Sequence, residues 1–241
     1  MPEKPDVLNR VRAALSTALT MEPDFAPEHI ECDDEGVLIL KGEVQSVKAK
    51  KLALEAVAAL PEVSGIVDRL RVAPASAMGD AEISAHLRNA FVGEPSFEAL
   101  EIAERIGDTV TSIKGVPVDP LGRVEIEVDS GVVILNGQVP GLDSKRLAGV
   151  LAWWVPGTRD VINGLVEPLG DDTPGMLQEA VRIVLDKDPF VNAGQIRVGA
   201  KGREVRLTGL VKSDAERSMA ERDAWYVFGI DGVINEIEVG A

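Results

Sequence analysis

A short motif occurs three times along the 241-residue chain, and this repetition constrains the fold more than any other feature. The first two copies read GVLILKGEV and GVVILNGQV, and the third is the shorter EVRLTGLV. The glycines near their ends are Gly42, Gly137 and Gly209. Repeated copies of one supersecondary unit are typical of tandem arrays. We therefore expect several small, similar domains rather than one large domain.

The spacing beyond each glycine is repeated as well. Residues 24, 26 and 28 positions further on form three matching sets, which are Ile66, Asp68 and Leu70; Val161, Asn163 and Leu165; and Val233, Asn235 and Ile237. The repeats are therefore predicted to cover residues 7–73, 80–168 and 176–241, with linkers rich in Pro, Gly, Ala and Asp between them. The second repeat is longer because it contains an extra segment at about 97–122.

Each repeat shows the same succession of apolar patterns. It opens at helical spacing, as with Val7, Val11 and Leu15, and continues with the alternation of a β-hairpin, as around Glu125 and Glu127. A second helix and a last strand follow. The pattern predicts an α+β fold of three tandem α-β-β-α-β units, each with a three-stranded sheet packed on two helices. Central strands are expected near 37–42, 132–137 and 204–209.

The second helix of each unit has a small-residue stripe at i, i+4 and i+7, which suits close packing on a sheet. The stripe residues are Ala53, Val57 and Leu60; Ala148, Ala152 and Val155; and Ala220, Ala224 and Val227. Ser46 and Ser213 are the expected N-caps, and Ser213 with Glu216 predicts a capping box.

The extra segment of the second repeat is expected to contain a helix near 97–106 and then a Gly- and Pro-containing excursion up to Arg123. Its apolar residues are Phe97, Leu100, Ile102, Ala103 and Ile106.

The repeated motif resembles that of the BON domain family, in which a Gly-Val-x-Leu-x-Gly-x-Val strand precedes an alanine-rich helix and a Val-x-Asn-x-Leu strand. The third copy has Arg203 in place of the first glycine, and the first copy has Asp68 in place of the asparagine. The resemblance implies an α/β domain without a known catalytic centre. It also implies phospholipid or envelope attachment, a role under osmotic stress, or, as in some relatives, potassium binding.

Composition excludes several classes of function. With 25 basic and 40 acidic residues, the net charge of −15 disfavours binding to nucleic acid. A single Cys32 and only two histidines argue against disulfides, zinc clusters and other metal sites, and no cofactor motif is present. Nothing resembles a membrane-spanning segment or a signal peptide, so we expect a cytoplasmic protein, or a periplasmic one if a leader has been removed.

The chain offers few candidates for chemistry. Acidic residues of the extra segment could form an enzyme site, but their spacing is that of a solvated helix face; they are Glu98, Glu101, Glu104 and Asp108. No catalytic residue is predicted. The repeated Gly42, Gly137 and Gly209 could admit a ligand, but a strained strand end explains them better. Asp68, Asn163 and Asn235 are expected to bond to a nearby turn backbone.

Aromatic residues are the strongest ligand or interface candidates. Two adjacent pairs stand at matched positions, 16 and 17 residues after the glycine, and they are Trp153 with Trp154 and Trp225 with Tyr226. Helical geometry turns Trp153 and Trp225 away from the stripe, which favours an interface with another repeat, another protein or a lipid surface.

These observations predict a non-enzymatic binding protein of the BON type. Its expected role is phospholipid- or envelope-associated stress protection. Two alternatives stay open, a potassium-responsive protein that binds a monovalent cation and a protein–protein scaffold.

Overall fold

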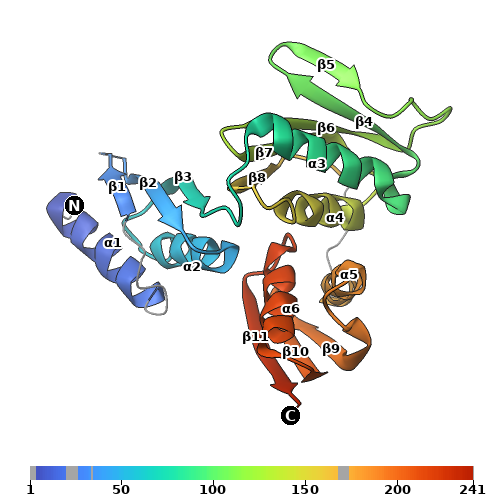
Figure 1. The fold of residues 1–241 in the computed structure, drawn as a ribbon. Coiled ribbons are helices and arrows are strands. Elements are labelled where there is room, and N and C mark those ends of the chain that lie inside the picture. Colours follow the sequence, from blue (N-terminus) through green and yellow to red (C-terminus); the bar gives the residue numbers. More distant parts are fainter. Residues whose placement is uncertain (1–3, 20–26, 34, 168–173, 241) are drawn as a thin grey trace. The chain divides into compact units, whose positions relative to one another are not determined.

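The computed structural model describes residues 4–19, 27–33, 35–167 and 174–240. The predicted end of the second repeat at Pro168 lies outside the described residues. The chain divides into two compact units, residues 1–73 and 74–241. The first repeat is therefore a unit by itself, whereas the second and third repeats share a unit. Figure 1 shows a small sheet with accompanying helices in each repeat.

The first repeat has the predicted order of elements. These are α1 (Lys4–Ala18), β1 (Pro27–Cys32), β2 (Val37–Val44), α2 (Val47–Ala58) and β3 (Gly65–Val72). The middle strand β2 pairs antiparallel with β1 and parallel with β3, so α2 is the crossover between two parallel strands. Val11 of α1, Leu40 of β2 and the stripe residues Ala53 and Val57 are fully buried and form the core.

The third repeat repeats this topology. Its elements are α5 (Pro174–Lys187), the 3-10 turn η2 (Ala193–Gln195), β9 (Ile196–Lys201), β10 (Glu204–Val211), α6 (Asp214–Tyr226) and β11 (Gly232–Val239). Here β10 is the middle strand, antiparallel to β9 and parallel to β11. The α+β class is thus confirmed, as are the central strands predicted near 37–42 and 204–209.

The second repeat contains a larger sheet. Its elements are α3 (Asp80–Gly93), η1 (Pro95–Phe97), β4 (Leu100–Ile106), β5 (Thr109–Ser112), β6 (Gly122–Asp129), β7 (Val132–Gln138), α4 (Leu142–Trp153) and β8 (Asp160–Asn163). The strand order is β5-β4-β6-β7-β8, so this unit has five strands and not the expected three. The strand predicted near 132–137 is β7.

The helix predicted near 97–106 is wrong, because this stretch forms β4. Leu100 and Ile102 are buried at alternate positions, as in a strand with one covered face. On the other face Glu101 and Arg105 make ion pairs with Arg123 and Glu125 of the neighbouring strand β6. An apolar set this short fits a helix or a strand equally well, and pairing with β6 decided the outcome.

The predicted caps are half right. Ser46 and Ser213 both accept a backbone N–H in the first turn of their helices, from Ala49 and Glu216 respectively. Glu216 does not complete a capping box with Ser213. Its carboxylate instead accepts the backbone N–H groups of Asn192 at 2.8 Å and Lys212 at 3.1 Å, and these two bonds keep its pKa below the usual range.

The repeated glycines have a structural explanation in two copies. Gly137 and Gly209 adopt positive φ angles of 122° and 144°. A Cβ at either position would collide with a backbone carbonyl oxygen, that of Arg123 in β6 or that of Gln195 just before β9. The neighbouring backbone therefore fills the space that a ligand would need.

The repeated Asn or Asp ties the last strand to the second helix, and its oxygen also accepts the backbone N–H two residues further along the chain. The Asn163 side-chain amide donates to the Lys145 carbonyl at 2.8 Å, and Asn235 donates to the Arg217 carbonyl at 3.2 Å. In the first repeat the partner is a side chain, because Asp68 pairs with the Lys50 ammonium at 3.0 Å. Lys50 occupies the same repeat position as Lys145 and Arg217. The last strand is therefore bonded to the second helix at one position by a salt bridge in the first repeat and by hydrogen bonds in the others.

Candidate functional site: the contact between the second and third repeats

Helix α4 of the second repeat contacts both α5 and α6 of the third. We call this contact the 2–3 interface. Its polar and aromatic members are Glu94, Lys145, Arg146, Trp153 and Trp154 on the second repeat, and Lys187, Asp188, Asp223, Tyr226 and Phe228 on the third. It is the place where the candidate aromatic residues meet.

Three of the four aromatic candidates lie at the 2–3 interface. The Trp153 ring stacks on Tyr226, with ring centroids 5.9 Å apart and planes inclined by 9°. The Trp154 indole Nε1 donates to Asp223 Oδ1 at 3.0 Å. Burial raises the pKa of Tyr226 to about 12, so its hydroxyl stays protonated at neutral pH. One residue of each matched pair, Trp153 and Tyr226, thus stacks across the repeats.

Trp225 differs from Trp153. Its side chain is only 3% exposed, whereas Trp153 is half-buried. Of the two indoles expected to face an interface, Trp153 lies at the 2–3 interface and stacks on Tyr226, and Trp225 is buried. Trp225 lies in the last turn of α6, which ends at Tyr226 before the extended Val227.

A buried arginine bonds across the 2–3 interface. Arg146 is 1% exposed, and its Nε donates to the Phe228 carbonyl oxygen at 3.0 Å. The neighbouring Lys145 places its ammonium 5.1 Å from the centre of the Phe228 ring, within cation–π range. A buried guanidinium at this position fixes orientation, because its planar donors require a partner at a defined place.

An ion pair holds another part of the contact. The Lys187 ammonium lies 2.9 and 3.0 Å from the two oxygens of Glu94, which is 8% exposed. Burial opposes ionisation of Glu94, but the Ser96 backbone N–H and Lys187 outweigh it, and the pKa of Glu94 lies below its usual value.

Two carboxyl groups, Asp188 and Asp223, are buried at the 2–3 interface with exposed fractions of 7% and 2%. Burial and, next, the neighbouring Asp188 raise the pKa of Asp223 to about 7, and the hydrogen bond from Trp154 opposes this rise. Sequence reasoning missed this group, although a signal was present. The matching positions of the other repeats hold the apolar residues Ala56 and Leu151. Asp223 is therefore a carboxylate at a position that is otherwise apolar.

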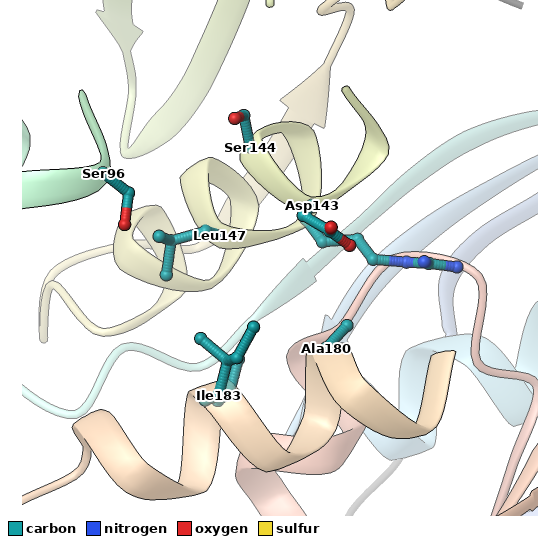
Figure 2. Close-up of a pocket in the computed structure, with 8 residues that line it drawn as sticks. Ser96, Asp143, Ser144, Leu147, Ala180 and Ile183 are labelled. Carbon is teal, nitrogen blue, oxygen red and sulfur yellow. The ribbon is translucent and has the colours of Figure 1, made fainter. Parts of the chain in front are cut away.

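A small cavity of about 90 Å³ lies between α4 and α5 (Figure 2). Leu147 of α4 and Ile183 of α5 point into it from opposite sides, and Ser96 and Asp143 lie at its edge. Ligand pockets are typically about 300–1,000 Å³, so this space is a packing gap and not a substrate site. Elsewhere, among the residues described, no three His, Cys, Asp or Glu side chains are grouped as a metal site would require.

Two of the four acidic residues considered for an enzyme site have structural partners. Glu104 accepts hydrogen bonds from Ser84 and Arg88, and Glu101 pairs with Arg123. In the part of the chain that the structure describes, no helix is both long and apolar enough to span a bilayer.

The chain is a tandem array of small α+β domains, and side chains join the second domain to the third. The BON domain model matches residues 8–74, 100–167 and 175–241, so the chain belongs to the BON domain family, and the three copies are confirmed. BON domains in general are non-catalytic binding domains, for phospholipids or proteins. The second match begins at β4 and leaves out α3, which nevertheless contacts β6 and α4 in the structure.

No curated protein matches the sequence. Among solved structures, the chain is similar to the C-terminal domain of CdsD, a structural protein of the type III secretion system of Chlamydia trachomatis, at 14% identity over 95% of this chain and 96% of that chain. A second CdsD structure matches at 15% identity over 95% and 92%. Both have a TM-score of 0.26.

Proposed function

We propose that this protein is a non-enzymatic binding protein in which the second and third repeats act as one body and present an apolar loop to a phospholipid surface. The loop, residues 113–121, joins β5 to β6 within the extra segment of the second repeat. The general binding role of BON domains supports the proposal. The observation that carries it is the exposure of this loop's aliphatic side chains.

The apolar loop is anchored at its base and exposed at its tip. Val116, Val118 and Leu121 are 57%, 108% and 63% exposed. At the base, the Ile113 N–H donates to the Ile102 carbonyl at 2.8 Å, and the Leu121 N–H donates to the Ala99 carbonyl at 2.9 Å. Backbone bonds to the sheet therefore hold the ends, while the tip keeps its apolar groups in water.

Burial of such side chains would supply the binding energy. Full burial of one aliphatic side chain is worth about 1.5–3 kcal/mol, so three could contribute several kcal/mol before ordering costs. The net charge of −15 would oppose binding to anionic lipid. We therefore expect binding to be driven by burial of apolar side chains. It should be stronger on zwitterionic than on anionic vesicles and little affected by salt.

Vesicle flotation tests this expectation. The full chain should float with phosphatidylcholine vesicles, and less with vesicles that also contain phosphatidylglycerol. Val118→Asp should reduce flotation by about tenfold, the effect expected from losing one buried aliphatic group. Ile106→Asp is the matched control, because Ile106 is 72% exposed but lies at the β4–β5 turn, outside the loop. Equal loss with both variants, or no flotation of the wild type, would count against the proposal.

A protein scaffold is the second candidate, and the same loop favours it. Pro117 and Pro120 restrict the backbone of the loop, which lowers the entropy cost of docking into a groove on a partner protein. The acidic charge does not oppose such a partner. Cross-links to a partner protein that form without vesicles, and that are lost when Val118 is changed, would favour the scaffold.

The predicted monovalent cation and the osmotic-stress role stay predictions. Potassium binding would raise the melting temperature of the full chain in KCl relative to NaCl at equal ionic strength. Equal melting temperatures in the two salts would remove this alternative.

A further inference from the structure

Asp188 and Asp223 form a buried carboxyl pair at the 2–3 interface. Asp188 lies just after α5 and accepts the Phe190 N–H at 2.8 Å, while Asp223 lies on α6 and accepts the Trp154 indole N–H at 3.0 Å. The second oxygen of Asp223 has no hydrogen-bond donor among the described residues, and it faces the Asp188 carboxyl. Two carboxylates cannot bond to each other unless one of them carries a proton.

The surrounding charges do not neutralise this pair in full. On α6 itself, Arg222 only partly offsets the burial of Asp223, and Tyr226 is uncharged at neutral pH. On the packed helices, Lys187 of α5 is bound to Glu94, Lys145 of α4 to Glu167 and Arg146 of α4 to the Phe228 carbonyl. The buried residues of β10 and β11 are apolar, as with Val205, Leu207 and Ile237. A proton is therefore the simplest way to relieve the repulsion.

The carboxylate at position 223 is not required by the fold. The matching residues of the other repeats are Ala56 and Leu151, and both repeats form the same helix. What distinguishes Asp223 is its contact with Trp154 of the neighbouring repeat. Its role is thus tied to the contact between repeats and not to the architecture of one repeat.

We propose that docking of the third repeat on the second is coupled to a single proton held between Asp188 and Asp223, so that the protonated pair closes the 2–3 interface and the fully ionised pair weakens it. This inference concerns the interface itself and does not depend on which partner the protein binds. It makes the interface a pH-sensitive joint.

The direction of the pH effect follows from the pKa of Asp223, which burial raises from the usual 3.8 to about 7. Opening the interface would rehydrate the carboxyl and lower its pKa, so docking takes up a proton. Docking is then strongest at acidic pH, weakens as the pH rises toward 7 and changes little above it. Each unit by which docking raises the pKa corresponds to a tenfold change in the docking equilibrium.

Urea titration of the full chain, followed by tryptophan emission, tests the proposal. The first transition should report separation of the two repeats, because Trp153 and Trp154 both lie at the contact. We expect the docking constant to be about tenfold lower at pH 8.0 than at pH 5.5. Across the same transition, small-angle X-ray scattering should show expansion, and circular dichroism should show no loss of helical signal.

Variants decide whether the carboxyl pair is responsible. Asp223→Asn should dock equally at both pH values, and Asp223→Leu, which copies the residue of the second repeat, should do the same. Asp186→Asn, on the exposed side of α5, is the matched control and should keep the wild-type dependence. If both Asp223 variants fail to fold, Asp188→Asn replaces them and should shift the dependence to lower pH. A wild type that docks equally at the two pH values, or an Asp223 variant with the full dependence, would overturn the proposal.

Discussion

The first repeat and the pair formed by the second and third repeats share one topology but differ in what their second helices present. Where the second repeat has Arg146, Trp153 and Trp154, the first has Lys51, Ala58 and Ala59. The first repeat is a compact unit by itself, and the other two share a unit. The stripe residues pack within each repeat, whereas the contact between the second and third repeats uses additional large or charged side chains.

The two kinds of helix also differ in how they fasten the last strand. Lys50 and Asp68 form a salt bridge in the first repeat, while Asn163 and Asn235 use backbone carbonyls in the others. A fold can therefore conserve the position of a bond while changing its chemistry. Pairing of the second and third repeats depends on side chains from both repeats.

The largest expected effect is at the buried arginine. Arg146→Ala removes a fully buried guanidinium and leaves the Phe228 carbonyl without this donor, so we expect a loss of about 3 kcal/mol in the unfolding free energy of the 74–241 unit. Lys51→Ala, at the matching position of the first repeat, should cost less than about 1 kcal/mol. Urea denaturation measures both, and equal losses would break the comparison between the units.

The aromatic stack is expected to contribute next. Trp153→Ala should weaken docking by about 2 kcal/mol through lost burial and the lost ring contact, and leave the secondary structure intact. A double-mutant cycle with Tyr226→Ala should give a coupling energy of about 0.5–1.5 kcal/mol. Additive effects of the two changes would show that the rings do not act as a pair.

Exchange of the two fastening chemistries should have a smaller effect, confined to one unit. Asp68→Asn removes the carboxylate that pairs with the buried Lys50 ammonium, so we expect the first unit to lose about 1–2 kcal/mol of stability. The 74–241 unit should be unaffected, as its own melting transition would report. A loss shared by both units would mean that the units are energetically coupled.

The smallest effect is expected at Glu94. The pKa of Glu94 lies below the usual 4.5 in the docked protein. Its stabilisation of docking is therefore complete above about pH 4.5 and is lost as the pH falls through the lowered pKa. Glu94→Gln should weaken docking by about 1 kcal/mol at neutral pH and remove this acid-side loss. Because the Glu94 contribution is complete above about pH 4.5 and the Asp223 contribution weakens as the pH rises toward 7, the wild type should dock most tightly near about pH 4.5. Calorimetry from pH 3.5 to 8 would detect this maximum.

Sequence reasoning succeeded where one periodicity governs a long stretch. The stripe residues Ala148, Ala152 and Val155 are buried as predicted, because a helix on a sheet must hide one face. It failed at residues 97–106, where five apolar residues fit two periodicities and only pairing with β6 selected the strand. Half of the capping box failed because Glu216 bonds to Asn192, 24 residues away in sequence.

The candidate site was predictable in its aromatic part only. Matched spacing singled out Trp153, Trp154 and Tyr226, but no local pattern links Arg146 to a carbonyl 82 residues further along the chain. The same applies to Lys187 and Glu94, which are 93 residues apart.

By itself the sequence determined that the chain contains three units, where their central strands lie and which helix faces are buried, because these features follow from short-range periodicity repeated three times. Only the tertiary structure decided the five-stranded sheet, the ion-paired outer face of β4 and β6, and the burial of Asp188 against Asp223. Those features arise where groups distant in the sequence are buried together, away from water. The free energy of a charged group is set by this buried environment and not by its neighbours in sequence.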